Sequence, residues 1–224
     1  MNNIPMISQL FDLEHTIAAP FLKRFSYPWE ALAGLSDFIK ELGSALDPQI
    51  YEQLSEHVWA AKDAKIAPTA FLGGPCIIDS GAEIRHCAFI RGSAIVGKRS
   101  VLGNSCEMKN SIIFDDAQAP HYNYIGDSIL GWHAHMGAGS ITSNVKSDRS
   151  DVTIKCGREC AGTGRYKVGA MLGDGVEIGC NSVLCPGTII GRKTNIYPLC
   201  RVRGVILENS IYKSEDNIVL KETK

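Results

Sequence analysis

The chain has 224 residues, of which 45% are hydrophobic, and its 23 Lys and Arg residues nearly cancel its 24 Asp and Glu residues. This composition excludes a disordered chain and predicts one domain, or one domain with a small appendage. The near-zero net charge excludes a global field that would attract nucleic acid or an anionic membrane.

The N-terminal sixty residues predict helices and no targeting segment. Helical spacing is shown by Leu32, Leu35, Phe38, Ile39 and Leu42, and Asp47-Pro48 predicts the start of a second amphipathic helix. We expect residues 1–62 to form a helical cap, which would cover the apolar end of a solenoid. No basic stretch precedes an apolar run here, and no span of about 18 apolar residues occurs, so we expect a cytoplasmic protein without a membrane partner.

An apolar residue recurs every six positions through the middle of the chain. The first run comprises Ile66, Leu72, Ile78, Ile84, Ile90, Val96, Leu102, Met108 and Phe114, and a later run comprises Leu172, Ile178, Leu184, Ile190, Ile196 and Val202. A period of six fits neither an α-helix nor simple alternation. It fits a short strand and a turn, repeated, in which one apolar residue of each hexad points inward. We predict a mainly β solenoid over residues 63–206, followed by a tail over 207–224.

Two interruptions of the hexad predict loops that project from the solenoid. The repeat breaks at Pro120 and resumes in a shifted register at Leu130, so we expect an insertion near 115–127. A Gly-rich, charged stretch predicts a second insertion near 155–168. Insertions in a solenoid become loops on one face, where binding is common, although a mobile polar hairpin is an equal alternative for the second.

The eight cysteines contain no C-x-x-C pair, and no secretory signal accompanies them, so we expect reduced thiols. Cys76, Cys106 and Cys200 each fall four places after an apolar repeat residue, which predicts small core side chains. Cys156 and Cys160 lie in the second insertion, and for this pair metal or redox chemistry stays open.

Arg91 and Lys109 occupy the second place of their hexads and lie eighteen residues apart. If three hexads make one coil, these cations stack on adjacent coils at a backbone spacing of about 4.8 Å. Two like charges so placed favour a bound anion, and a phosphate or diphosphate fits a cationic pair. The alternative is two solvated surface cations that splay apart.

A histidine and an asparagine come after these cations in the chain. His121 lies two hexads beyond Lys109, and an imidazole near a bound phosphate suits proton removal from an amine during acyl transfer. Asn144 adds an amide at the end of a Gly-rich stretch, where a turn residue is the alternative.

Three motifs resemble those of one family. G-N-S-C-E-M-K-N resembles its E-M-K motif, P-H-Y-N-Y-I-G-D its H-x-x-Y-x-G-D motif, and G-A-G-S-I-T-S-N its G-A-G-T-I-T-x-N motif. Residues 91–144 are thus similar to the C-terminal acetyltransferase domain of the bifunctional N-acetylglucosamine-1-phosphate uridyltransferase/glucosamine-1-phosphate acetyltransferase, a hexapeptide-repeat acyltransferase. The resemblance implies a left-handed parallel β-helix, a homotrimer and acetyl-CoA as co-substrate, and we predict no metal.

The resemblance also implies site residues. The catalytic general base would be His121. The substrate-binding set would be Arg91, Lys109, Tyr124, His135 and Asn144. The cofactor-binding set would be Ala138, Val145, Cys180 and Pro198.

Three of these positions depart from the family. His135 stands where the family has Asn, Val145 where it has Tyr, and Cys180 where it has Ser. The changes leave the base and the phosphate-binding residues in place while altering the acceptor and CoA walls. We therefore predict acyl transfer to an amino-sugar phosphate or a nucleotide sugar. The first sixty residues show no Gly-rich nucleotide loop, so nucleotidyl transfer by this chain alone is not expected.

Two other functions compete with this prediction. A non-catalytic subunit related to UDP-N-acetylglucosamine pyrophosphorylase would bind a sugar phosphate or nucleotide sugar without transfer, and the altered Val145 and Cys180 favour it. A zinc carbonic anhydrase on the same fold needs three His ligands. His86 and His121 lie one residue short of two coils apart, and no His comes closely enough after His121, which disfavours it.

Overall fold

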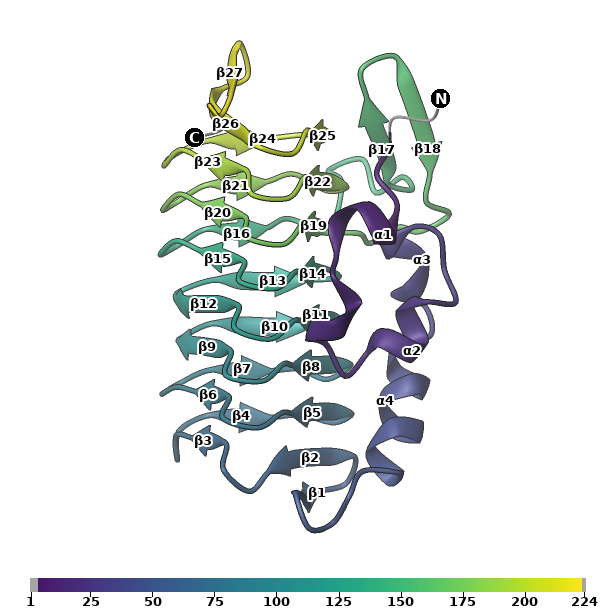
Figure 1. Ribbon diagram of the computed structural model, residues 1–224, viewed down its shortest axis with the longest axis vertical. Coiled ribbons are helices and arrows are strands. Elements are labelled where there is room, and N and C mark those ends of the chain that lie inside the picture. The colour runs from purple at the N-terminus through teal and green to yellow at the C-terminus, as the bar shows by residue number, and fades with distance from the viewer. Residues whose placement is uncertain (1–3, 223–224) are drawn as a thin grey trace.

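A computed structural model describes residues 4–222, which form a parallel β-helix with helices along one side (Figure 1). Successive strands enter sheet A, then sheet B, then sheet C, and the next strand returns to sheet A one coil further on. Strands from successive coils therefore pair in parallel within each sheet. The predicted left-handed parallel β-helix is confirmed.

The three sheets contain short strands. Sheet A comprises β1 (Tyr51–Ser55), β2 (Val58–Ala61), β5 (Cys76–Ile78), β8 (Ala94–Val96), β11 (Ser111–Ile113), β14 (Ile129–Leu130), β19 (Ala170–Leu172), β22 (Thr188–Ile190) and β25 (Val205–Ile206). Sheet B comprises β3 (Lys65–Ile66), β6 (Glu83–Ile84), β9 (Val101–Asn104), β12 (Gln118–His121), β15 (His135–Met136), β20 (Glu177–Ile178), β23 (Asn195–Ile196), β26 (Ser210–Ser214) and β27 (Asn217–Leu220). Sheet C comprises β4 (Phe71–Leu72), β7 (Phe89–Ile90), β10 (Glu107–Lys109), β13 (Tyr124–Gly126), β16 (Ile141–Thr142), β21 (Val183–Leu184) and β24 (Arg201–Val202).

One apolar side chain from each hexad fills the interior of the helix. Ile78 pairs with Val96, eighteen residues later, so three hexads make one coil in this part of the chain. The side chains of Ile78 and Val96 are both fully buried in one continuous core. Cys76, Cys106 and Cys200 belong to the same core, as predicted.

Two coils are one residue shorter because the turn after β10 and the turn after β13 each lose a position. Ile113 pairs with Val96 only seventeen residues away and enters the interior. Phe114 therefore lies outside the coil and packs against Phe11, with ring centroids 5.1 Å apart. The prediction of Phe114 as an interior residue was wrong, since the register shifts at the shortened turn.

The expected insertion near 115–127 is also wrong. This segment contains β12 and β13, which keep parallel register with β9 and β10 of the preceding coil. The shifted hexad therefore reflects shortened turns and not a projecting loop.

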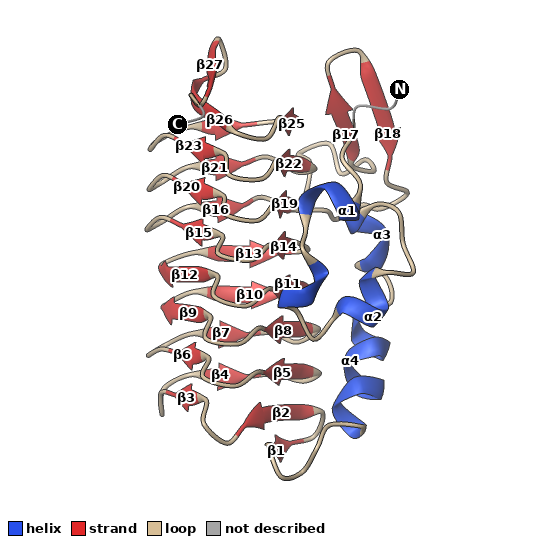
Figure 2. Ribbon diagram, in the orientation of Figure 1, coloured by secondary structure: helices blue, strands red, loops and turns tan. Residues whose placement is uncertain are grey.

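The N-terminal segment covers a sheet face instead of the end of the first coil (Figure 2). It comprises α1 (Ile7–Leu10), a 3₁₀ turn (Leu13–His15), α2 (Ala19–Leu22), α3 (Pro28–Ala31) and α4 (Leu35–Ser44). The outward side chains of sheet A share one buried cluster with this segment and with Val152, Ile154 and Val168 of the second insertion. They are Ile77, Ile95, Ile112, Ile129, Met171 and Ile189. The expected cap over residues 1–62 is thus corrected to a cover along sheet A, because an uninterrupted apolar column outside the coils needs burial.

The second expected N-terminal helix is not formed. Asp47 accepts a hydrogen bond from the Gln49 N–H at 2.8 Å and closes only a turn. The chain then enters β1, which pairs antiparallel with β2 at the end of sheet A. Pairing this exposed strand satisfies its backbone groups, and that requirement overrides the helical pattern.

Two hairpins rise at the C-terminal end of the solenoid (Figure 1). The chain leaves the coil after β16 and returns at β19, so the second insertion occupies residues 143–169 and contains the antiparallel strands β17 (Thr153–Cys156) and β18 (Glu159–Gly162). The region predicted as a tail contains the antiparallel pair β26 and β27. No helix in residues 4–222 is long and apolar enough to cross a membrane.

Replacing Phe114 by Ala should lower the free energy of unfolding by about 3–5 kcal/mol, because a fully buried ring is lost between sheet A and the N-terminal segment. The matched control is Phe71→Ala, since Phe71 is 59% exposed on sheet C. Urea unfolding monitored by circular dichroism measures both. Equal losses in the two variants would contradict the cover described here.

Candidate active site

The predicted site residues gather at two corners of the solenoid on either side of sheet C. The B/C corner joins a sheet B strand to the next sheet C strand, and the C/A corner joins that strand to the next sheet A strand. Because a sheet C strand spans two or three residues, the corners lie about 10 Å apart.

Arg91 and Lys109 stack at the C/A corner on adjacent coils, as predicted, because β7 and β10 pair in register. Each cation has a carboxylate partner. Arg91 donates to Glu107 at 2.7 Å, which raises the pKa of the guanidinium. Lys109 lies 3.4 Å from Asp127. The two cations are therefore held apart by carboxylates, and a bound anion is not required to explain their stacking.

Asp127 connects the polar residues of the C/A corner. Its carboxylate is buried and accepts hydrogen bonds from the side-chain amides of Asn110 at 2.7 Å and Asn144 at 2.6 Å. The Asn144 amide also lies 3.3 Å from the Tyr124 hydroxyl. Lys109, Tyr124 and Asn144 thus form one network around a single buried carboxylate.

Tyr124 lies on the outer face of sheet C, between the two corners. Burial raises the pKa of its phenol, and the Asn144 hydrogen bond only partly opposes that shift. The hydroxyl therefore stays protonated at neutral pH. It accepts from Asn144 and keeps its own proton available for a ligand on the sheet face.

A cavity of about 440 Å³ opens at the C/A corner between the solenoid and the second insertion. Its solenoid side includes Arg91, Lys109 and Asp127, and its other side is the segment Gly164, Arg165, Tyr166 and Lys167. Sequence reasoning missed Glu107, Asp127, Arg165 and Tyr166 as members of this region. The carboxylates could have been found from their motif positions, but the fold-back of the insertion leaves no sequence signal.

His121 lies at the B/C corner, across sheet C from the two cations. It is exposed at the end of β12, so the expectation that it sits beside Arg91 and Lys109 is corrected. The residues predicted to bind acetyl-CoA lie at the same corner on later coils. The Gly139 N–H donates to the His121 carbonyl, the Asn181 N–H to that of Ala138, and the Leu199 N–H to that of Cys180.

Ala138, Cys180 and Pro198 therefore form a column that starts one coil beyond His121. Cys180 and Pro198 are exposed, and Ala138 is partly exposed. A ligand that ran along this column would meet backbone and small side chains. Tyr122 and Leu199, on either end of the column, are 64% and 80% exposed.

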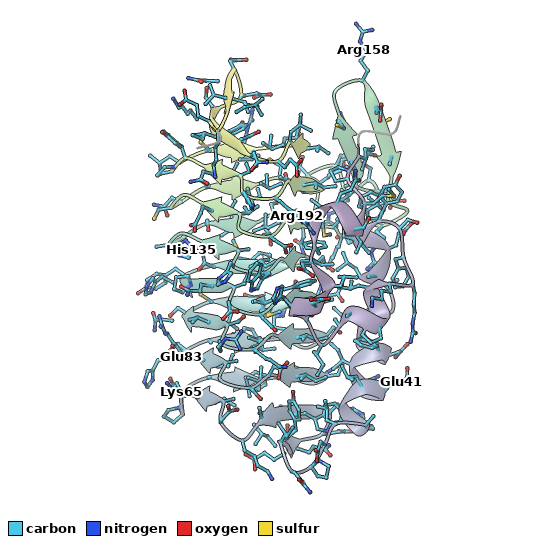
Figure 3. All side chains as sticks on the ribbon, in the orientation of Figure 1. Glu41, Lys65, Glu83, His135, Arg158 and Arg192 are labelled. Atoms are coloured by element: carbon cyan, nitrogen blue, oxygen red, sulfur yellow. The ribbon has the colours of Figure 1, made fainter. Side chains whose placement is uncertain are left out.

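The two remaining predicted residues are His135 and Val145. His135 stands on the outer face of sheet B and contacts Glu177 at 2.9 Å, with Figure 3 placing it away from the second insertion. Val145 lies at the base of the insertion, where it forms a backbone bridge with Lys167. Val145 directly follows Asn144 and so borders the Tyr124 network, whereas His135 lies on another sheet.

No group of three or more His, Cys, Asp or Glu side chains in residues 4–222 is arranged to hold a metal ion. His86 instead contacts Thr69 Oγ1 at 2.9 Å on an earlier coil.

Residues 72–160 match the family described as the GMPPB C-terminal domain. The chain is 31% identical over 199 residues to the Bifunctional protein GlmU of Methanococcus maripaludis, covering 88% of this chain and 48% of that protein. It is 33% identical over 111 residues to the bifunctional sugar-1-phosphate nucleotidylyltransferase/acetyltransferase of Sulfurisphaera tokodaii, covering 50% and 28%. A solved structure, UDP-N-acetylglucosamine O-acyltransferase of Moraxella catarrhalis, matches with a TM-score of 0.38 at 12% identity over 73% of this chain and 72% of that one.

The hexads and the stacked coils define a hexapeptide-repeat parallel β-helix protein. Within that class, the chain is similar to the bifunctional GlmU proteins over most of its own length, so the resemblance carried by its motifs is confirmed. The chain spans about half the length of these curated relatives.

Arg91→Ala and Lys109→Ala should each weaken a phosphate-bearing ligand by about 1.5–3 kcal/mol, because each removes a charge-assisted hydrogen bond. Isothermal titration with glucosamine 1-phosphate measures the effect. Arg99→Ala is the control, since Arg99 pairs with Asp116 at the corner between sheets A and B. If both site variants bind glucosamine 1-phosphate as tightly as the parent, Arg91 and Lys109 form surface ion pairs only.

Proposed function

We propose that this chain is an acetyl-CoA-dependent acyltransferase that acts on an amino sugar carrying phosphate. The supporting observation is the arrangement on sheet C. Cationic and amide groups occupy the C/A corner, and an exposed imidazole, His121, occupies the B/C corner of the coil that contains Tyr124.

The corner separation suits a sugar phosphate. A phosphate at Arg91 and Lys109 would leave its sugar across sheet C, where the Tyr124 hydroxyl and the Asn144 amide supply hydrogen bonds. The amino group of such a sugar would then reach the B/C corner, about 10 Å away. Binding and proton transfer are thus assigned to opposite corners of one sheet.

In the proposed reaction, His121 accepts a proton from the amine as the nitrogen attacks the thioester carbonyl. A new carbon–nitrogen bond forms, and the carbon–sulfur bond breaks after the tetrahedral intermediate. The proton passes from His121 to the departing CoA thiolate. A backbone N–H near Ala138 would stabilise the oxyanion, an effect worth about 3 kcal/mol.

Acetyl-CoA would lie along the column formed by Ala138, Cys180 and Pro198. This column begins one coil from His121, so a thioester there would be within reach of the base. The exposed side chains of Tyr122 and Leu199 offer apolar surface that acetyl-CoA or a neighbouring subunit could contact.

The proposal includes a homotrimer, since a column on one solenoid becomes a groove only when a second solenoid lies beside it. Phe71 and Phe89 are also exposed on sheet C, where their rings meet edge to face at 5.5 Å. His135, on the outer face of sheet B, would then serve the site of a neighbouring subunit. The predicted cytoplasmic location belongs to the same proposal.

His121→Ala should lower the transfer rate by about 10²–10⁴-fold, the usual contribution of a general base, while ligand binding persists. Release of CoA thiol with amino-sugar phosphates and nucleotide sugars measures the rate.

His86→Ala is the matched control, because His86 lies at the same B/C corner on an earlier coil. It should leave the rate within about twofold, as expected of a substitution outside the site. If His121→Ala also retains the parent rate, the base is misassigned. If the parent releases no thiol with any acceptor, the chain is a binding subunit.

A further inference from the structure

The second insertion brings two cations to the C/A corner in addition to Arg91 and Lys109. Arg165 and Lys167 line the cavity opposite the solenoid residues. Neither has an ion pair within the described part of the chain, and the Arg165 Nε atom is buried with no hydrogen-bond partner there. A buried donor without an acceptor is costly, and no carboxylate in the described residues pairs with the half-buried Arg165 side chain.

The charges of the cavity do not balance without a ligand. Glu107 neutralises Arg91, and Asp127 neutralises Lys109. Arg165 and Lys167 remain, so the cavity retains two uncompensated positive charges. The diphosphate bridge of a nucleoside-diphosphate sugar carries one negative charge on each phosphate and would balance them.

The segment that contains these cations is held in place by backbone hydrogen bonds and buried valines. The Val152 N–H donates to the Arg165 carbonyl at 2.8 Å, and the Val168 N–H donates to the Asn144 carbonyl at 3.1 Å. Val152 and Val168 are fully buried against the apolar cluster outside the coils. Arg165 and Lys167 are therefore preorganised, which reduces the entropy lost when a ligand binds.

The cavity is also larger than one phosphate requires. Water occupies about 30 Å³ per molecule in the liquid, so about 440 Å³ accommodates two phosphates and part of the group beyond them. Tyr166 lies in the same lining and is 42% exposed, with Lys167 Nζ 5.4 Å from its ring. An exposed aromatic ring beside a phosphate site is suited to stacking on a nucleobase.

We propose that the cavity between the C/A corner and the segment Gly164–Lys167 binds the nucleotide part of a nucleoside-diphosphate sugar. Arg165 and Lys167 contact the diphosphate, and Tyr166 stacks on the base. The sugar extends from the diphosphate over sheet C towards His121. The assignment of the sugar as the group that accepts the acyl group rests on the proposed function. The nucleotide site is inferred from Arg165, Tyr166 and Lys167 alone.

Isothermal titration of the full chain with UDP, GDP and glucosamine 1-phosphate tests the proposal. At least one nucleoside diphosphate should bind about 10-fold or more tightly than the sugar phosphate. The double variant Arg165→Gln/Lys167→Gln should weaken that nucleotide by about 10- to 100-fold and glucosamine 1-phosphate by less than about threefold. Tyr166→Ala should weaken the nucleotide by about 10-fold and leave inorganic diphosphate unchanged.

Arg158→Gln is the matched control, since Arg158 is an exposed cation at the tip of the same hairpin, away from the cavity (Figure 3). It should bind every ligand as the parent does. The proposal is overturned if the parent binds glucosamine 1-phosphate as tightly as both nucleotides, a comparison that needs no variant. It is also overturned if the double variant weakens all ligands equally. Nucleotide binding without thiol release would contradict only the proposed transfer.

Discussion

The structure depends on the requirement that each coil returns in register onto the coil before it. Parallel pairing places equivalent residues of successive coils about 4.8 Å apart, so any side chain repeated at one coil position becomes a column. Inside, the columns are apolar and form the core. Outside, the same rule stacks isoleucines on sheet A, cations at the C/A corner and small residues at the B/C corner.

The shortened turns shape the C/A corner. Removing one residue after β10 and another after β13 turns Phe114 outward and brings the buried Asp127 carboxylate into contact with Lys109, Asn110 and Asn144. The insertion begins one coil later at the same corner and folds back over this network. A local change in turn length therefore builds a polar site at one corner of the solenoid.

Residues whose positions depend on periodicity could be predicted from the sequence. Ile78 and Ile90 lie in the core because a period of six directs one side chain of each hexad inward. Residues that depend on chain geometry outside the period were harder to place. Asp47-Pro48 has the local signal of a helix but leads directly into β1, which pairs with β2, and His121 comes after Lys109 in sequence but lies across sheet C. The fold-back of Arg165 depends on tertiary contacts that no local pattern encodes.

The most direct measurement is a crystal structure of the chain with CoA and a nucleoside diphosphate bound. We expect three chains about a threefold axis, CoA along Ala138, Cys180 and Pro198, and the diphosphate between Lys109 and Arg165. The CoA sulfur should lie at the corner that contains His121. CoA bound instead in the cleft of about 790 Å³ between the two terminal hairpins, with the C/A corner empty, would contradict the proposed site.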